Sequence, residues 1–215
     1  WDVGTGQVVQ RLEGHGGAVA RCAFLPDGRI VSGGWGGEVR LWDSVTGKQV
    51  GRLEGLPSTD TVYALSVRPD GGEVLVGTAY GRVRAWELPS GKVSFESDAL
   101  SDLSKSTRVW TIGTLDDGRR FGGGEIGRTV IWEGDAVART IGTQPTSGLP
   151  LPGGRLLLGG EGEVILVDPK KDPVRIGSLS KWVYALALSP RGDRVLAGNK
   201  AGRSAVWALA DRTLQ

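Results

Sequence analysis

The sequence predicts an all-β protein built from repeated four-stranded antiparallel units. The first observation is a tryptophan that recurs about every 40 residues, a spacing typical of repeat architectures. The second is a turn signal at a matching offset in each interval, flanked by two apolar runs of strand length. The third is 36 glycines in 215 residues without a collagen period, a composition typical of short strands and tight turns. No helix signal of useful length accompanies them.

The repeat is defined by its closing position and by a glycine five residues before it. The closing positions are Trp1, Trp42, Trp86, Trp132, Val167 and Trp207. The glycines are Gly37, Gly81, Gly127, Gly162 and Gly202. A tight hairpin turn needs a residue with positive φ, and glycine adopts that conformation without strain. The glycine series therefore predicts one hairpin turn in each of five units.

Each unit is interpreted as four short strands. In the first unit we expect them near 18–25, 29–33, 37–42 and 48–53. The other units are expected near 61–97, 107–141, 145–177 and 181–207. The fourth unit follows the pattern least well, because its first strand contains Pro145, Gly148 and Pro150 and because Val167 replaces the closing tryptophan.

Charge and cysteine usage exclude several classes of partner. The net charge is +2, from 26 basic and 24 acidic residues, so neither nucleic acid nor a membrane surface is expected as a partner. No apolar run is long enough to span a membrane. The single cysteine, Cys22, allows no internal disulfide and favours a cytoplasmic location. We expect Cys22 to be a buried, inert residue within a strand.

These repeats resemble the WD40-repeat β-propeller family, in a divergent form similar to its bacterial members. The resemblance rests on Gly14-His15, on the five turn glycines, and on endings such as VRLWD at 39–43 and VRAWE at 83–87. It implies that each four-stranded sheet is one blade of a β-propeller, with five repeat units visible. Neighbouring blades must then stack, because one blade cannot bury both of its faces alone.

Two arrangements of the ring remain open. Residues 7–12 are expected to form an outer strand that completes the last blade, which would close a five-bladed ring as a single domain over 1–215. Alternatively, the chain is a fragment of a longer ring, which its start within a repeat favours. Self-association is then possible, because the ring would be incomplete.

The resemblance also implies a buried hydrogen-bond network around the only histidine. His15 would join Ser32 and the closing Trp42, while the family's aspartate position falls on Gly36. We therefore expect an incomplete network and a structural histidine. The same position is occupied by Tyr80, Ile126, Glu161 and Ala201 in the other units. Trp86, Trp132 and Trp207, like Trp42 and Trp1, are expected in or near the core.

Catalytic, metal and cofactor sites lack the residues that they need. One histidine and one cysteine provide no cluster of metal ligands, and no nucleophile, base and orienting residue can be assigned as a set. No glycine-rich loop leads from a strand into a helix. We expect no catalytic residue, no metal and no cofactor, and a protein that is not an enzyme.

Several aromatic residues do not belong to the closing series and are expected on one rim of the propeller. Trp35 lies in a turn between the second and third strands, and Trp110 and Trp182 lie early in innermost strands. Aromatic and arginine side chains dominate binding hot spots. The expected partner-binding rim comprises Trp35, Tyr63, Arg108, Trp110, Glu125, Trp182, Tyr184 and Lys200. The alternative is that the aromatic residues of the first strands pack between blades.

The function expected from these features is a non-catalytic scaffold that binds a protein or peptide on this rim. An alternative is a regulatory or sensor propeller domain of a larger, bacterial enzyme or signalling protein. A propeller enzyme, such as a quinone-dependent dehydrogenase, is disfavoured because the sequence has no histidine pair.

Overall fold

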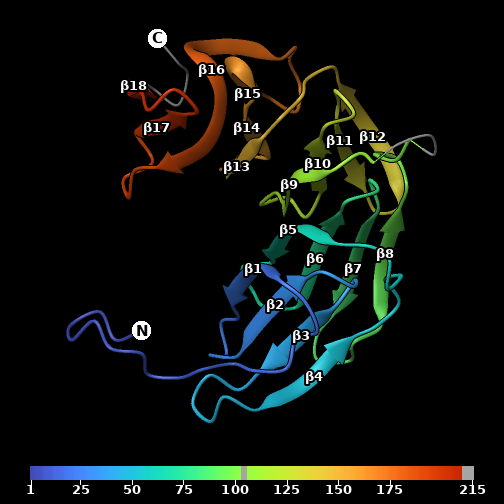
Figure 1. Cartoon of the computed structure of the whole chain (residues 1–215). Helices are drawn as coiled ribbons and strands as arrows, with labels where there is room; N and C mark the ends of the chain where they lie inside the picture. The colour runs from blue at the N-terminus through green and yellow to red at the C-terminus, as the bar shows by residue number, and fades with distance from the viewer. Residues whose placement is uncertain (103–105, 210–215) are drawn as a thin grey trace.

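The protein was studied as a computed structural model, which describes residues 1–102 and 106–209. Its regular secondary structure over these residues consists of β-strands (Figure 1). The first sheet has the order β1-β2-β3-β4 and contains β1 (Val19–Phe24), β2 (Ile30–Gly34), β3 (Val39–Trp42) and β4 (Gln49–Leu53). These strands lie where the sequence placed them, and the predicted all-β class with antiparallel four-stranded units is confirmed.

The second and third sheets repeat the same antiparallel meander. The second contains β5 (Val62–Val67), β6 (Glu73–Thr78), β7 (Val83–Glu87) and β8 (Val93–Ser97). The third contains β9 (Val109–Thr114), β10 (Arg120–Gly124), β11 (Thr129–Glu133) and β12 (Ala136–Ile141). The inner strands β1, β5 and β9 of successive sheets lie side by side.

The last two units are joined into one six-stranded sheet. It contains β13 (Ser147–Leu151), β14 (Arg155–Gly159), β15 (Glu161–Val167), β16 (Val174–Leu188), β17 (Arg194–Asn199) and β18 (Ser204–Ala208). The first part of β16 pairs with β15 and its second part pairs with β17, so one strand serves both units. Lys181, between the two parts, has φ of 76°, a left-handed conformation that is unusual for a lysine.

The fourth unit forms its predicted first strand in spite of its prolines. Pro150 lies within β13, whose strand partner in this sheet is β14 alone. A proline is tolerated in such an edge strand, because the missing N–H interrupts no second ladder. Together the five units follow one another around an arc from the blue to the red end of the chain (Figure 1).

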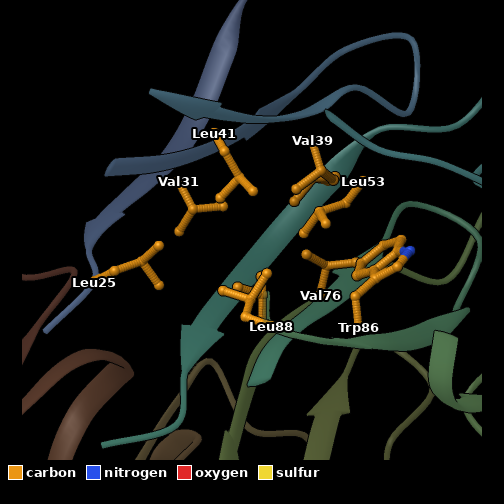
Figure 2. Packing of buried hydrophobic residues seen from close by; sticks show 10 residues of the cluster. Leu25, Val31, Val39, Leu41, Leu53, Val76, Trp86 and Leu88 are labelled. Carbon is orange, nitrogen blue, oxygen red and sulfur yellow. The ribbon is translucent and has the colours of Figure 1, made fainter. Parts of the chain in front are cut away.

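The hydrophobic core lies between successive sheets. For each sheet we call the face toward the preceding sheet the front face, and the face toward the following sheet the back face. At the first junction, Val31 and Leu41 of the back face of the first sheet pack against Val76 and Trp86 of the second sheet (Figure 2). Three further clusters fill the next junctions in the same way. Each sheet therefore depends on its neighbours to remove its apolar side chains from water.

The closing tryptophans Trp42, Trp86 and Trp132 are fully buried, and Trp207 is half-buried. Two predictions of burial are wrong. Trp1 is 83% exposed, because no described strand surrounds it and no neighbouring sheet covers it. Cys22 is exposed because it lies on the front face of the first sheet, opposite Ser32, and no described sheet precedes that face.

The expected outer strand at 7–12 is not formed. These residues pair with no strand in the described structure and are largely exposed. They run past the outer turn of the first sheet instead, where the Gln10 side chain donates a 3.5 Å hydrogen bond to the Thr46 carbonyl. A strand forms only along the free edge of a partner strand. Residues 7–12 lie beside the turn between β3 and β4, so they do not pair with β18. The predictions of a closed ring and of a fragment of a longer ring both stay open.

No helix among the described residues is both long and apolar enough to cross a bilayer.

Candidate functional site

A cavity opens at the end of the inner strands where β9 and the second part of β16 begin. Its volume is about 450 Å³, and we call it the rim cavity. It is lined by Arg21, Trp110, Glu125, Gln144, Thr146, Trp182 and Tyr184. Strands β1, β9 and β16 therefore contribute side chains to one hollow, although they are far apart in sequence.

Four of the eight expected rim residues line this cavity, namely Trp110, Glu125, Trp182 and Tyr184. Tyr184 is 53% exposed, whereas Trp110 and Trp182 are half-buried. The aromatic residues of β9 and β16 thus keep part of their ring surface open to solvent. A ligand that covered them would bury large aromatic area, which is the property that makes such residues binding hot spots.

Tyr63 and Arg108 do not line the cavity, but both contact Trp110, which does. The rings of Tyr63 and Trp110 meet edge to face, with centroids 5.4 Å apart. The Arg108 guanidinium lies 5.4 Å from the Tyr63 centroid and 5.7 Å from the Trp110 centroid, within the range of cation–π contacts. Arg108 also pairs with the Glu125 carboxylate at 3.1 Å. Trp110 is therefore held in place by these contacts before any partner arrives.

The remaining two expected residues are placed differently. Trp35 is 59% exposed in the turn after β2 and forms an isolated bridge with Thr61, just before β5, so it lies at the junction of the first two sheets rather than in the cavity lining. A Cβ on Gly17 would come 2.9 Å from the Trp35 Cβ, so glycine is needed beneath this side chain. Lys200 donates its backbone N–H to the Trp182 carbonyl, 2.9 Å away, and is exposed beside the cavity.

Sequence reasoning missed three residues of the cavity lining, Arg21, Gln144 and Thr146. The expected rim rested mainly on aromatic residues that interrupt the repeat, and these polar side chains carry no motif. Arg21 could have been found from its place in the first inner strand, in the same part of the repeat as Tyr63. Gln144 and Thr146 flank Pro145, in the segment that departs most from the repeat.

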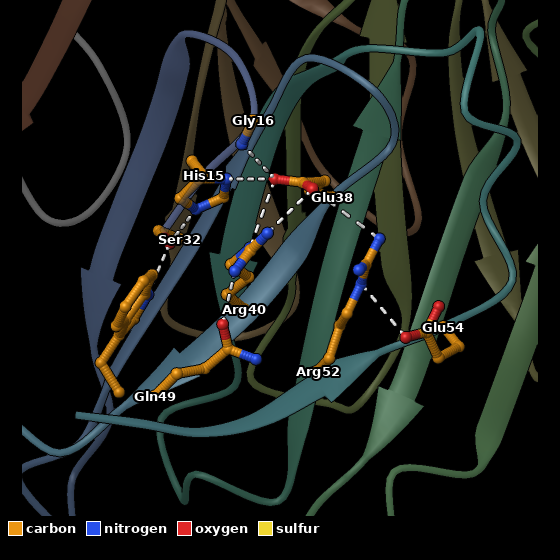
Figure 3. Close-up of polar contacts among 9 residues, drawn as sticks. His15, Gly16, Ser32, Glu38, Arg40, Gln49, Arg52 and Glu54 are labelled. Carbon is orange, nitrogen blue, oxygen red and sulfur yellow. Dashed lines mark hydrogen bonds and ion pairs between the residues drawn. The ribbon is translucent and has the colours of Figure 1, made fainter. Parts of the chain in front are cut away.

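A second polar cluster surrounds the only histidine (Figure 3). His15 Nδ1 lies 3.0 Å from Glu38 Oε2, and His15 Nε2 lies 2.6 Å from Ser32 Oγ. The Trp42 Nε1–H donates to Ser32 Oγ over 2.8 Å. The expectation of an incomplete network is wrong, because Glu38 supplies the carboxylate that Gly36 cannot.

In this network Glu38 is ionised and His15 is neutral. Hydrogen bonds from Arg40, together with those from Gly16 N–H and His15, lower the pKa of Glu38 to about 2. Burial lowers the pKa of His15, so its ring is neutral near pH 7. An ionised carboxylate only accepts, so His15 Nδ1–H donates to Glu38 and Nε2 accepts from the Ser32 hydroxyl.

The order serine, histidine, carboxylate is also that of a hydrolase triad. Here, however, Ser32 is 4% exposed, and its oxygen already accepts the indole N–H of Trp42. Glu38 is bound by Arg40 at 2.9 Å, so its charge serves an ion pair as well as the imidazole. The bonding therefore fits a structural clasp between the segment before β1 and the β2–β3 hairpin, rather than an exposed nucleophile.

Metal ligation finds no support in the part of the chain that the structure describes, because no group of three or more histidine, cysteine, aspartate or glutamate side chains lies close enough together to hold an ion.

Comparison with known proteins adds a family and several relatives. Residues 6–43 match the family model described as WD domain, G-beta repeat. The chain is 34% identical over 130 residues to a periodic tryptophan protein 2 homolog of Schizosaccharomyces pombe, which is 60% of this chain and 14% of that protein. It is 33% identical over 104 residues to periodic tryptophan protein 2 of Saccharomyces cerevisiae, covering 48% of this chain and 11% of that protein.

A third relative belongs to a different group of proteins. The chain is 36% identical over 112 residues to the small ribosomal subunit protein RACK1y of Oryza sativa subsp. japonica, covering 49% of this chain and 33% of that protein. The chain thus spans a third or less of the length of these relatives. The repeat match and the relatives together support the WD40-repeat family.

Proposed function

We propose that this WD40-repeat chain is a non-catalytic interaction module that binds a protein or peptide partner at the rim cavity and along its aromatic border. The observation that supports this most is the cluster of partly exposed Trp110, Trp182 and Tyr184 around one cavity of about 450 Å³. Fold alone does not assign a function, so the proposal rests on this site.

The cavity suits recognition better than chemistry. Its lining contains aromatic rings, one carboxylate paired with Arg108, and amide and hydroxyl groups, but no histidine or cysteine. Hot spots in protein interfaces combine a few large aromatic or arginine anchors with a polar surround. Trp35, exposed at the junction of the first two sheets, would extend the contact beyond the cavity.

The experiment is capture of a partner by the chain and by three matched variants. Trp182→Ala and Tyr184→Ala remove cavity anchors, and Trp35→Ala removes the anchor at the junction. Trp1→Ala serves as the control, because Trp1 is more exposed than any of these but lies in the N-terminal segment. Proteins retained by the unchanged chain are identified by mass spectrometry, and each is then tested as a purified binary pair.

We expect the three rim variants to lose the partner while keeping the circular dichroism spectrum and thermal midpoint of the unchanged chain. Trp1→Ala should retain it. Retention of every partner by both cavity variants would overturn the rim assignment. Unfolding of Trp182→Ala would be resolved by Tyr184→Ala, whose side chain is more exposed.

A second candidate is a regulatory or sensor domain of a larger protein. It is favoured by the lengths of the relatives, since the matched region is 14% of the Schizosaccharomyces pombe protein. Reading the complete open reading frame around this sequence tests it: a catalytic or signalling domain in the same polypeptide would support it, and its absence would leave the interaction module alone.

A further inference from the structure

We propose that the rim cavity selects an acidic peptide segment, in which an aspartate or glutamate pairs with Arg21 while a neighbouring apolar side chain lies against Trp110, Trp182 and Tyr184. This inference rests on the proposed function and specifies the chemistry of the partner. It follows from the arrangement of charge around the cavity.

The only carboxylate in the cavity lining is already neutralised. Arg108 Nη1 lies 3.1 Å from Glu125 Oε1, and the Arg108 backbone N–H donates to Glu125 Oε2 over 3.2 Å. Both carboxylate oxygens therefore have a partner. A basic ligand group would therefore meet a carboxylate whose charge is already offset by Arg108, which also lies against the rings of Tyr63 and Trp110.

The arginine in the lining is available. Arg21 is exposed, and its Nη1 donates to the carbonyl of its own neighbour Ala20 at 2.8 Å. Among the described residues no carboxylate lies within ion-pair distance of Arg21. A guanidinium offers five N–H donors, so most of its hydrogen-bonding capacity faces solvent and the cavity. Arginine and carboxylate form charge-assisted, frequently bidentate pairs.

The charged residues next to the cavity are also mainly basic. Lys181 precedes Trp182, and the Lys200 backbone bonds to the Trp182 carbonyl. Both lysines are exposed and have no ion-pair partner among the described residues. Glu161, exposed opposite Trp182 in the β15–β16 ladder, is the carboxylate nearest to them in register. Four basic residues thus lie in the lining or next to residues of the lining, against the two carboxylates of Glu125 and Glu161, so the local net charge favours an acidic segment over a basic one.

The aromatic residues of the lining determine which apolar side chain the ligand needs. Trp110 and Trp182 leave part of their rings uncovered, and Tyr184 is half exposed. A bulky apolar side chain next to the acidic residue would cover these rings at the moment when the carboxylate meets Arg21. A segment with acidic and apolar residues one or two positions apart therefore fits the cavity better than a purely acidic run.

The test is selection of peptides by the full chain from a random library of acetylated, amidated heptapeptides. We expect aspartate or glutamate to be enriched within two positions of phenylalanine, tyrosine, tryptophan or leucine. The selected peptides should bind about tenfold more weakly to Arg21→Gln, the loss that one charge-assisted hydrogen bond represents. Arg21→Glu should shift the selection toward lysine and arginine, and binding to the unchanged chain should weaken as salt is raised.

The matched control is Arg191→Gln, an exposed arginine in the turn at the opposite end of the second part of β16. It should leave selection and affinity unchanged. Enrichment of basic or uncharged peptides, or equal effects of the Arg21 and Arg191 variants, would overturn the acidic preference while leaving rim binding in place. Capture of peptides that is insensitive to both Trp182→Ala and Tyr184→Ala, or no capture at all, would count against the rim proposal itself.

Discussion

The front faces of the first and second sheets have the same strand pattern and opposite surroundings. Val62 of the second sheet is fully buried, because the back face of the first sheet covers it. Val19 occupies the equivalent place in the first inner strand and is 51% exposed. Phe24, at the end of the same strand, is 71% exposed. Burial in this fold is therefore a property of a junction between two sheets and not of a strand.

The same pair of sheets buries its closing tryptophans by two different means. Trp86 is covered by the preceding sheet, and its Nε1–H donates to the Glu54 carbonyl, 2.9 Å away. Trp42 has no preceding sheet among the described residues, but its Nε1–H donates to Ser32, which is tied to His15 and Glu38. A polar network therefore holds Trp42 in place, whereas a neighbouring sheet holds Trp86. The stability that each arrangement provides should respond differently to mutation and to pH.

The largest difference is expected from Trp86→Ala. Removing a fully buried indole at a junction should lower the free energy of unfolding by about 3–5 kcal/mol. Trp35→Ala, which truncates an exposed indole, should change it by about 0.5 kcal/mol or less. Urea unfolding followed by tryptophan fluorescence measures both. Similar costs for the two variants would contradict the assignment of the core to the junctions.

Val62→Ala and Val19→Ala compare the two front faces most directly, because the same side chain is truncated at equivalent places in both sheets. The Val62 Cγ1 would lie 2.8 Å from a Cβ on Gly33, so its methyl groups fill the junction. Losing two buried methyl groups should cost about 2 kcal/mol. Val19→Ala should cost about 0.5 kcal/mol or less, since that side chain is half in water. Equal losses on urea unfolding would show that the front face of the first sheet is covered in solution.

Ser32→Ala tests the polar alternative. It leaves the buried Trp42 Nε1–H without its acceptor and His15 Nε2 without its donor, at a cost of about 1–3 kcal/mol. Ser90→Ala in the outer turn of the second sheet is the control, because that hydroxyl is exposed and should contribute little. Thermal unfolding of both variants gives the measurement, and a Ser32 variant as stable as the control would exclude the clasp as a source of stability.

The polar network of the first sheet should also make stability depend on pH. The pKa of His15 is lowered on folding, so the unfolded chain binds more protons below about pH 6.5, and the stability from His15 should fall as the pH drops through that value. The pKa of Glu38 is lowered from 4.5 to about 2, so its contribution is present above pH 4.5 and is lost toward pH 2.

The measurement compares the unchanged chain with Glu38→Gln by urea unfolding from pH 8 to pH 3. The difference in their unfolding free energies should shrink as the pH falls from 4.5 to 3, where the Glu38 carboxylate begins to lose its advantage over glutamine. A difference that grows between pH 4.5 and pH 3 would have the wrong sign for an ionised, hydrogen-bonded carboxylate.

Local pattern was sufficient to predict the strands within the repeats, although it also predicted a strand at 7–12 that is not formed. The predicted ranges 18–25 and 29–33 enclose or overlap β1 and β2, because turn glycines and apolar alternation are encoded by adjacent residues. The continuous β16 was not expected, since pairing on both sides of Lys181 is a property of the sheet. Burial was mispredicted at Trp1 and Cys22, because burial depends on whether a neighbouring sheet covers the residue. The sequence of one strand does not encode that neighbour.

The site was only partly predictable. Its aromatic residues stand out from the repeat, so Trp110, Trp182 and Tyr184 could be placed on one rim. Arg21 enters the same cavity from a strand far away in sequence, which no motif reports. Glu38 was missed because we assigned the carboxylate to a fixed position, Gly36, whereas a longer side chain two residues later reaches the same imidazole.

The exposed thiol of Cys22 makes the coverage of one face chemically measurable. It is the single cysteine of the chain and lies in an apolar groove of about 300 Å³ with Val19 and Phe24. A maleimide added to the native protein therefore reports one site without any engineered label. The ratio of its reaction rate before and after unfolding gives the fraction of time that this face is open, in whatever assembly or length of chain the protein is prepared.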